Sequence, residues 1–158
     1  MRLARADARK RAPRGEAMIL FTAAGQTFAI AAAAVDEIRT IEGLRPTPLR
    51  GKVHAILERG AISHYVVDAA AHFRLPAVAA RHVLLLRHSV VALGIDAVDR
   101  MTAILRLHAL PRAFAGEERR WYRGLALVEG RVVPVVDPDA FLTRAELAAL
   151  AVEGAVSA

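Results

Sequence analysis

The chain has 158 residues, of which 55% are hydrophobic but only 5% aromatic, and its net charge is +6. A chain of this length buries roughly 68–70% of its unfolded surface, which is enough for a core built mainly from alanine, valine and leucine. It has no cysteine, which excludes a disulfide framework, a thiolate metal site and a cysteine nucleophile. Since no apolar run approaches the roughly 18 residues that span a bilayer, we expect a cytoplasmic protein without membrane insertion.

The positive charge is concentrated at the start of the chain. Residues 1–16 hold six basic side chains against Asp7 and Glu16, whereas the other 142 residues carry 16 basic and 14 acidic groups. Because phosphate binding needs lysine and arginine clustered on a folded surface, the near-neutral body argues against a nucleic-acid partner. We expect residues 1–16 to form a disordered basic tail and not an export signal, since an apolar centre is missing.

Short apolar segments separated by turn residues follow the tail, and this pattern predicts β-hairpins. The first half is expected to contain, in order, a hairpin over 18–30, a strand over 35–39, a loop over 43–51, a second hairpin over 53–67 and a short helix over 69–73. In the second hairpin, the turn is expected at Glu58, Arg59 and Gly60. Asp68 stands directly before the helix, where an aspartate can cap the first free N–H groups.

The second half is expected to contain, in order, a hairpin over 82–95, a strand over 98–105, a surface loop over 112–120 and a hairpin over 123–136. Asp137 followed by Pro138 is typical of a helix start, since aspartate caps and proline is favoured at the first helical position. This predicts an amphipathic helix over 141–152.

Two stretches of the first half have counterparts in the second. Residues 35–38 (VDEI) match residues 98–101 (VDRM), and residues 60–68 (GAISHYVVD) match residues 130–137 (GRVVPVVD). In the second match the first copy is one residue longer, which predicts a bulge or a shifted strand register.

The repeat predicts two similar β units in one chain, because short strands at regular spacing are typical of sandwiches and barrels. We expect an all-β protein in which a domain over 17–150 holds two barrel subdomains, approximately 17–80 and 81–150. A short connecting helix and a C-terminal helix accompany them, and residues 151–158 are expected to form a flexible C-terminus.

A search for catalytic or metal-binding patterns finds none. The serines Ser63, Ser89 and Ser157 lie outside any nucleophile-elbow pattern, and the glycines form no phosphate-binding loop. The six histidines show neither HExxH nor HxH spacing, and helix capping accounts for Asp68 and Asp137. We therefore expect no enzyme activity, no cofactor and no metal, and a function that depends on the protein surface.

From about residue 18 to residue 145, the order of segments resembles the CheW-like domain family. The segments that carry the resemblance are ILFTAAGQTFAI (19–30), VDEI (35–38), ILERG (56–60), VVD (66–68), GIDAVDRM (94–101) and WYRGLALVEGRVVPVVDPDAFL (121–142). The resemblance implies two intertwined SH3-like, five-stranded β-barrels without catalytic activity.

The resemblance also implies partners. Members of this family bind the regulatory domain of a CheA-type histidine kinase and the cytoplasmic tip of chemoreceptors, in arrays associated with the membrane. By the same resemblance, Val35 and Glu37 fall in the kinase-binding element, and Arg59 with Gly60 falls in the receptor-binding turn.

Each of these residues has a second interpretation that the sequence leaves open. Val35 suits a core position, Glu37 a solvated charge, and Arg59 an ordinary exposed arginine. The chain also departs from the family pattern: Glu58 precedes Arg59 and is expected to weaken its attraction to an acidic partner, and His64 with Tyr65 replaces a proline region. The alternative function is a basic-tailed module that binds nucleic acid or an anionic membrane surface.

Overall fold

The computed structural model describes residues 15–42, 44–46 and 51–156, so most of the predicted tail over 1–16 and of the predicted loop over 43–51 lies outside the described residues. The strands are β1 (Glu16–Ala23), β2 (Gln26–Ala31), β3 (Val35–Thr40), β4 (Arg45–Pro46), β5 (Val53–Arg59), β6 (Ile62–Asp68), β7 (His82–Leu86), β8 (Val91–Ile95), β9 (Ala97–Ile104), β10 (Tyr122–Val128) and β11 (Arg131–Val136). The helices are the 3-10 turns η1 (Ala32–Ala34) and η2 (Gly116–Arg120) and the α-helices α2 (Ala69–His72) and α3 (Arg144–Val156).

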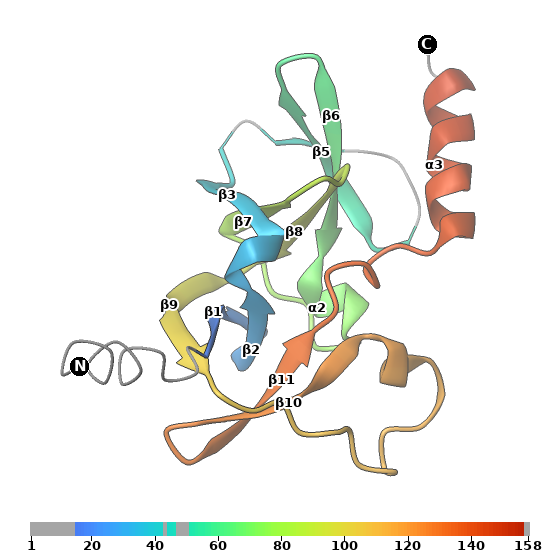
Figure 1. Ribbon diagram of the computed structural model, residues 1–158. Helices are drawn as coiled ribbons and strands as arrows, with labels where there is room; N and C mark the ends of the chain where they lie inside the picture. Colours follow the sequence, from blue (N-terminus) through green and yellow to red (C-terminus); the bar gives the residue numbers. More distant parts are fainter. Residues whose placement is uncertain (1–14, 43, 47–50, 157–158) are drawn as a thin grey trace, which may run out of the picture.

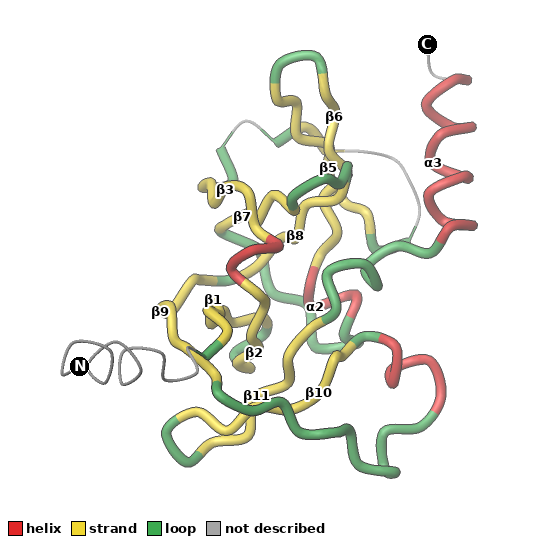
Figure 2. The backbone as a smooth tube through the Cα atoms, viewed as in Figure 1, coloured by secondary structure: helices red, strands yellow, loops and turns green. Residues whose placement is uncertain are grey.

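The described strands form two sheets, as Figure 1 shows. Sheet A has five strands in the order β10-β11-β2-β1-β9, and sheet B has six in the order β3-β7-β8-β6-β5-β4. Each sheet takes strands from both halves of the chain, so the units are intertwined and the change of sheet does not fall at residue 80. Strands and loops make up most of the described chain in Figure 2, which confirms the mainly β fold class.

The topology confirms the internal repeat. In each sheet, two hairpins are joined by one parallel contact, β11 with β2 in sheet A and β6 with β8 in sheet B. The order β10-β11-β2-β1-β9 therefore corresponds to β5-β6-β8-β7-β3, and β4 is an addition to sheet B. The strand pairings among the described residues leave both sheets open instead of closing them into barrels.

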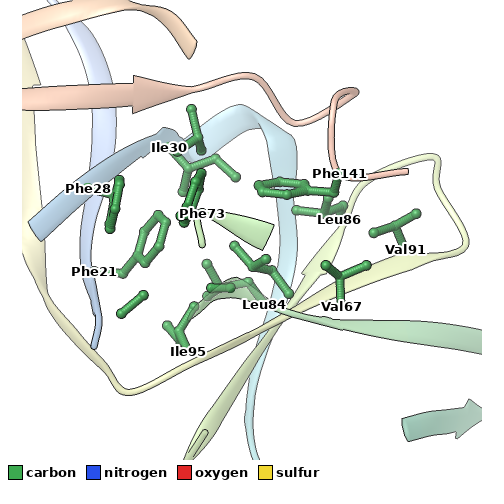
Figure 3. Close-up of a cluster of buried hydrophobic side chains, with 14 of the residues drawn as sticks. Phe21, Phe28, Ile30, Val67, Phe73, Leu84, Leu86, Val91, Ile95 and Phe141 are labelled. Carbon is green, nitrogen blue, oxygen red and sulfur yellow. The ribbon is translucent and has the colours of Figure 1, made fainter. Parts of the chain in front are cut away.

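The buried side chains form three clusters. One lies between the two sheets and contains most of the aromatic rings, including Phe21, Phe28, Phe73 and Phe141 (Figure 3). The second lies within sheet A and the third within sheet B. Alternation along a strand sends successive side chains to opposite faces, so a strand buried on both faces reads as a continuous apolar run.

The hairpin β5–β6 takes up the extra residue of the first repeat in its turn. The turn residues are Gly60 and Ala61 in this hairpin, but Glu129 and Gly130 in β10–β11. Counted from these turns, β6 and β11 run in step, and His64 occupies the place of Val133. The predicted bulge or register shift from the extra residue is therefore wrong, and Arg59 ends strand β5 instead of lying in the turn.

The two predicted helix caps are also wrong. Asp68 precedes α2 but makes no capping hydrogen bond through its side chain. The Oδ1 atom of Asp137 accepts a hydrogen bond from the backbone N–H of Asp139 at 2.9 Å, which makes a local turn and not a helix start.

The C-terminal helix begins at Arg144 instead of residue 141, because Thr143 and Glu146 form a reciprocal capping box. Phe141 and Leu142 lie before it and are buried in the core between the sheets. The helix ends at Val156, beyond the predicted end at residue 152.

Candidate functional site

A cluster of four charged side chains joins strands β3 and β5, and we call it the mouth cluster: Asp36, Glu37, Arg39 and Arg59. Arg59 Nη1 lies 2.6 Å from Asp36 Oδ2, and Arg59 Nε lies 3.4 Å from Glu37 Oε2. The second carboxylate oxygen of Glu37 accepts a hydrogen bond from Arg39 Nε. Glu37 and Arg59, which the sequence assigned to different partners, thus belong to one cluster.

The backbone of β3 explains how two consecutive acids reach one arginine. Val35 pairs with Leu86 and Glu37 with Leu85, so Asp36 is the extra residue of a β-bulge. A bulge re-aims a side chain that regular alternation would send to the opposite face. Because β3 lies at one edge of sheet B and β5 near the other, the Arg59–Asp36 pair also shows that the sheet curls toward closure.

The ion pairs shift the pKa of each partner. The hydrogen bond from Arg59 lowers the pKa of Asp36, and the hydrogen bond from Arg39 lowers that of Glu37. The pKa of Arg59 is raised, chiefly by its hydrogen bond to Asp36. These groups are partly exposed, so the pairs contribute little to stability, and the arrangement serves better to hold Arg59 ready for another carboxylate.

Asp36 and Arg59 line a cavity of about 390 Å³ at the end of sheet B. The other residues of its lining are Ile62, His64, Leu86, His88, Ser89 and Val90. His64 is only 5% exposed, and neither of its ring nitrogens has a hydrogen-bond partner among the described residues. Burial lowers the pKa of this imidazole, and Arg59 and Arg39 lower it further, so the ring is neutral near pH 7.

The structure separates the predicted site residues into three kinds. Val35 is 7% exposed and packs in the core between the sheets, in agreement with its alternative interpretation as a core residue. Glu37 and Arg59 are on the surface, with about a third of each side chain exposed. Gly60 has a φ of +61° in the hairpin turn, a backbone conformation that glycine adopts more readily than other residues.

Glu58 does not face Arg59, although the sequence suggested that it would weaken that arginine. Successive residues of a strand point to opposite faces, and Glu58 instead binds Arg45 of β4 at 2.7 Å. The acids that hold Arg59 are Asp36 and Glu37. Sequence reasoning did not assign Asp36 or His64 to the site. The repeated Val-Asp pair at 35–36 and 98–99 was the available signal for Asp36.

Sheet A has a corresponding mouth with different chemistry. There Arg100 of β9 lies 2.8 Å from Glu129 in the β10–β11 turn. Arg100 occupies the position of Glu37, so the charge at that position is reversed. Both residues line a larger cavity, about 750 Å³ in volume, and Val133 stands where sheet B has His64.

In the part of the chain that the structure describes, no group of three or more histidine, aspartate or glutamate side chains could hold a metal ion. Over the same residues, none of the helices has the length and apolar character needed to cross a membrane.

Comparisons with known proteins agree with this architecture. The family model of the CheW-like domain matches residues 17–146. Among solved structures, the chain is similar to the scaffolding protein TtCheW from Thermoanaerobacter tengcongensis, with a TM-score of 0.73 and 13% sequence identity; the match covers 85% of this chain and 92% of that chain. At this identity the likeness shows the fold alone. No curated protein matches the chain.

Proposed function

The chain belongs to the CheW-like domain family, and from this premise we propose that it is a non-enzymatic adaptor that couples chemoreceptors to a CheA-type histidine kinase. The proposed partners are the regulatory domain of the kinase and the cytoplasmic tip of the receptor. The working location is the cytoplasm, at membrane-associated receptor arrays.

The observation that carries this proposal is that Arg59 is shared between Asp36 and Glu37. In the proposed complex, Glu37 belongs to the kinase contact, while Arg59 and the Gly60 turn belong to the receptor contact. A receptor carboxylate that binds Arg59 releases the two acids of β3, and this changes the surface that the kinase meets. Since coupling between two binding sites is reciprocal, each partner then alters the affinity for the other.

The chemistry of the cluster favours protein recognition. An arginine fork binds carboxylates through two parallel hydrogen bonds, and Arg59 is exposed over about 40% of its side chain. Val35 acts indirectly in this proposal, because its buried side chain fixes the start of β3 beside the bulge at Asp36.

The test is to measure binding of the purified protein to two probes, the isolated regulatory domain of a CheA-type kinase and a receptor-tip fragment, both from the same cell. Each should bind in the micromolar range, as is usual for a small, transient interface. Absence of binding to both probes, with the protein folded by circular dichroism, would contradict the proposal.

A further inference from the structure

His64 occupies an unfavourable position unless something else uses it. A buried polar group without a hydrogen-bond partner typically destabilises a fold by about 1–3 kcal/mol, and native proteins leave few such groups. Both ring nitrogens of His64 are in this condition among the described residues. The fold itself does not require a polar side chain here, because the corresponding place in sheet A is taken by Val133 in an apolar cluster.

The ring lies beside a space that could supply the missing partner. His64 is part of the lining of the 390 Å³ cavity, together with Arg59 and Asp36. Two exposed aliphatic residues, Ile62 and Val90, belong to the same lining and are 56% and 41% exposed. The cavity thus combines a cation, an unused imidazole and an apolar rim.

We propose that this cavity receives an aspartate or glutamate side chain of the receptor tip, and that His64 determines specificity by donating its ring N–H to that carboxylate beside Arg59. This inference rests on the proposed function, since it names the group that the receptor contact recognises. An aliphatic neighbour of the acidic residue packs on Ile62 and Val90.

A carboxylate suits the cavity better than a neutral group. It only accepts hydrogen bonds and has room for several, so it can accept from Arg59 and from His64 together. Asp36 and Glu37 already accept from Arg59 or Arg39, but neither bonds to His64. An incoming carboxylate therefore gains a donor that the acids of the chain leave unused.

The charges that face His64 come from three elements. Arg59 extends from β5, while Arg39, Asp36 and Glu37 extend from β3. His88, in the β7–β8 turn, lines the same cavity. A carboxylate placed against the imidazole adds a negative charge at short range, which favours the protonated ring and raises the pKa of His64.

The binding test compares the wild type with His64→Val and His64→Gln against the receptor-tip fragment, and uses the kinase regulatory domain as the second probe. Valine is the residue found at the corresponding place in sheet A, so it should fold, and glutamine restores an N–H donor. We expect His64→Val to bind the receptor tip at least tenfold more weakly, His64→Gln to recover most of the affinity, and all three proteins to bind the kinase domain equally. Equal affinity of the wild type and His64→Val for the tip would overturn the inference and leave the proposed function standing.

A second measurement follows the histidine rings by NMR during titration with the receptor tip. The pKa of His64 should rise on saturation. His72 provides an internal control in the same spectrum, because it is also buried, with its pKa lowered to about 3, and does not line the cavity. An unchanged pKa of His64 in the saturated complex would contradict the inference. A wild-type protein that binds neither probe would overturn both this inference and the proposed function, whereas binding of the kinase domain alone would overturn the inference.

Discussion

Sheets A and B share one strand order but differ in the chemistry at their mouths. Sheet B has an arginine held by two acids above a buried histidine, whereas sheet A has a single Arg100–Glu129 pair and an apolar Val133. The bulged aspartates Asp36 and Asp99 are common to both. The shared features are thus those that the fold needs, and the features found in sheet B alone are the better candidates for function.

The core between the sheets gives the largest effect, because it serves both units. Phe28 is 2% exposed and stacks on Phe73 with ring centroids 4.4 Å apart. Truncation by Phe28→Ala should lower the free energy of unfolding by about 3–5 kcal/mol. Chemical denaturation followed by circular dichroism measures this loss, and wild type and variant should each unfold in one transition. Two separated transitions would show that the sheets are independent units.

The next largest effect should come from charge reversal at the mouth of sheet B. Arg59→Glu removes the fork and adds a third acid beside Asp36 and Glu37, so we expect at least about tenfold weaker binding to the receptor tip. Arg100→Glu is the matched control, since it reverses a similarly exposed arginine in sheet A. Calorimetric titration of both variants tests this, and an equal loss from both would mean that the two mouths are equivalent for receptor binding.

Exchange of the corresponding core residues sharpens the comparison in terms of stability. His64→Val removes two unsatisfied buried nitrogens and should raise the free energy of unfolding by about 1 kcal/mol, whereas Val133→His should lower it by about 1–3 kcal/mol. Urea denaturation of both variants measures the difference. A lower stability of His64→Val would indicate that the imidazole has a structural partner in the folded chain.

The smallest effect concerns acid stability. The pKa of Asp36 is lowered below its ordinary value of 3.8 by Arg59. A lowered pKa in the folded state adds stability above the unfolded pKa, and this stability is lost as the pH falls through the folded pKa. Arg59→Met should therefore return the pKa of Asp36 toward 3.8 and reduce the loss of stability below that pH. NMR titration of the carboxyl group measures the change, and an unchanged pKa would exclude Arg59 as its cause.

Much of the fold could be predicted from the sequence, because hairpins depend on local patterns. Apolar alternation and turn residues located the hairpins, and the Val-Asp and Gly-to-Asp repeats indicated two related units. Helix starts were less predictable, since Asp137 and Thr143 are both good caps in isolation. The burial of Phe141 and Leu142 and the capping box with Glu146 decided for Thr143.

The site was predictable only in part, because its geometry depends on contacts between distant strands. The family resemblance identified Glu37 and Arg59, which lie together in the cluster. The inclusion of Asp36 required the β3 bulge, which is visible only in the strand register. The orientation of Glu58 toward Arg45 likewise depends on the small strand β4, and the burial of His64 on the curl of sheet B.

The most direct test of the adaptor function is a co-sedimentation assay with receptor-tip assemblies, the isolated kinase regulatory domain and the full chain. The account predicts that the regulatory domain sediments with the receptor assemblies only when this protein is present, and that Arg59→Glu abolishes this co-sedimentation while the variant still binds the regulatory domain. Sedimentation of the regulatory domain at the same level with and without the protein would contradict it.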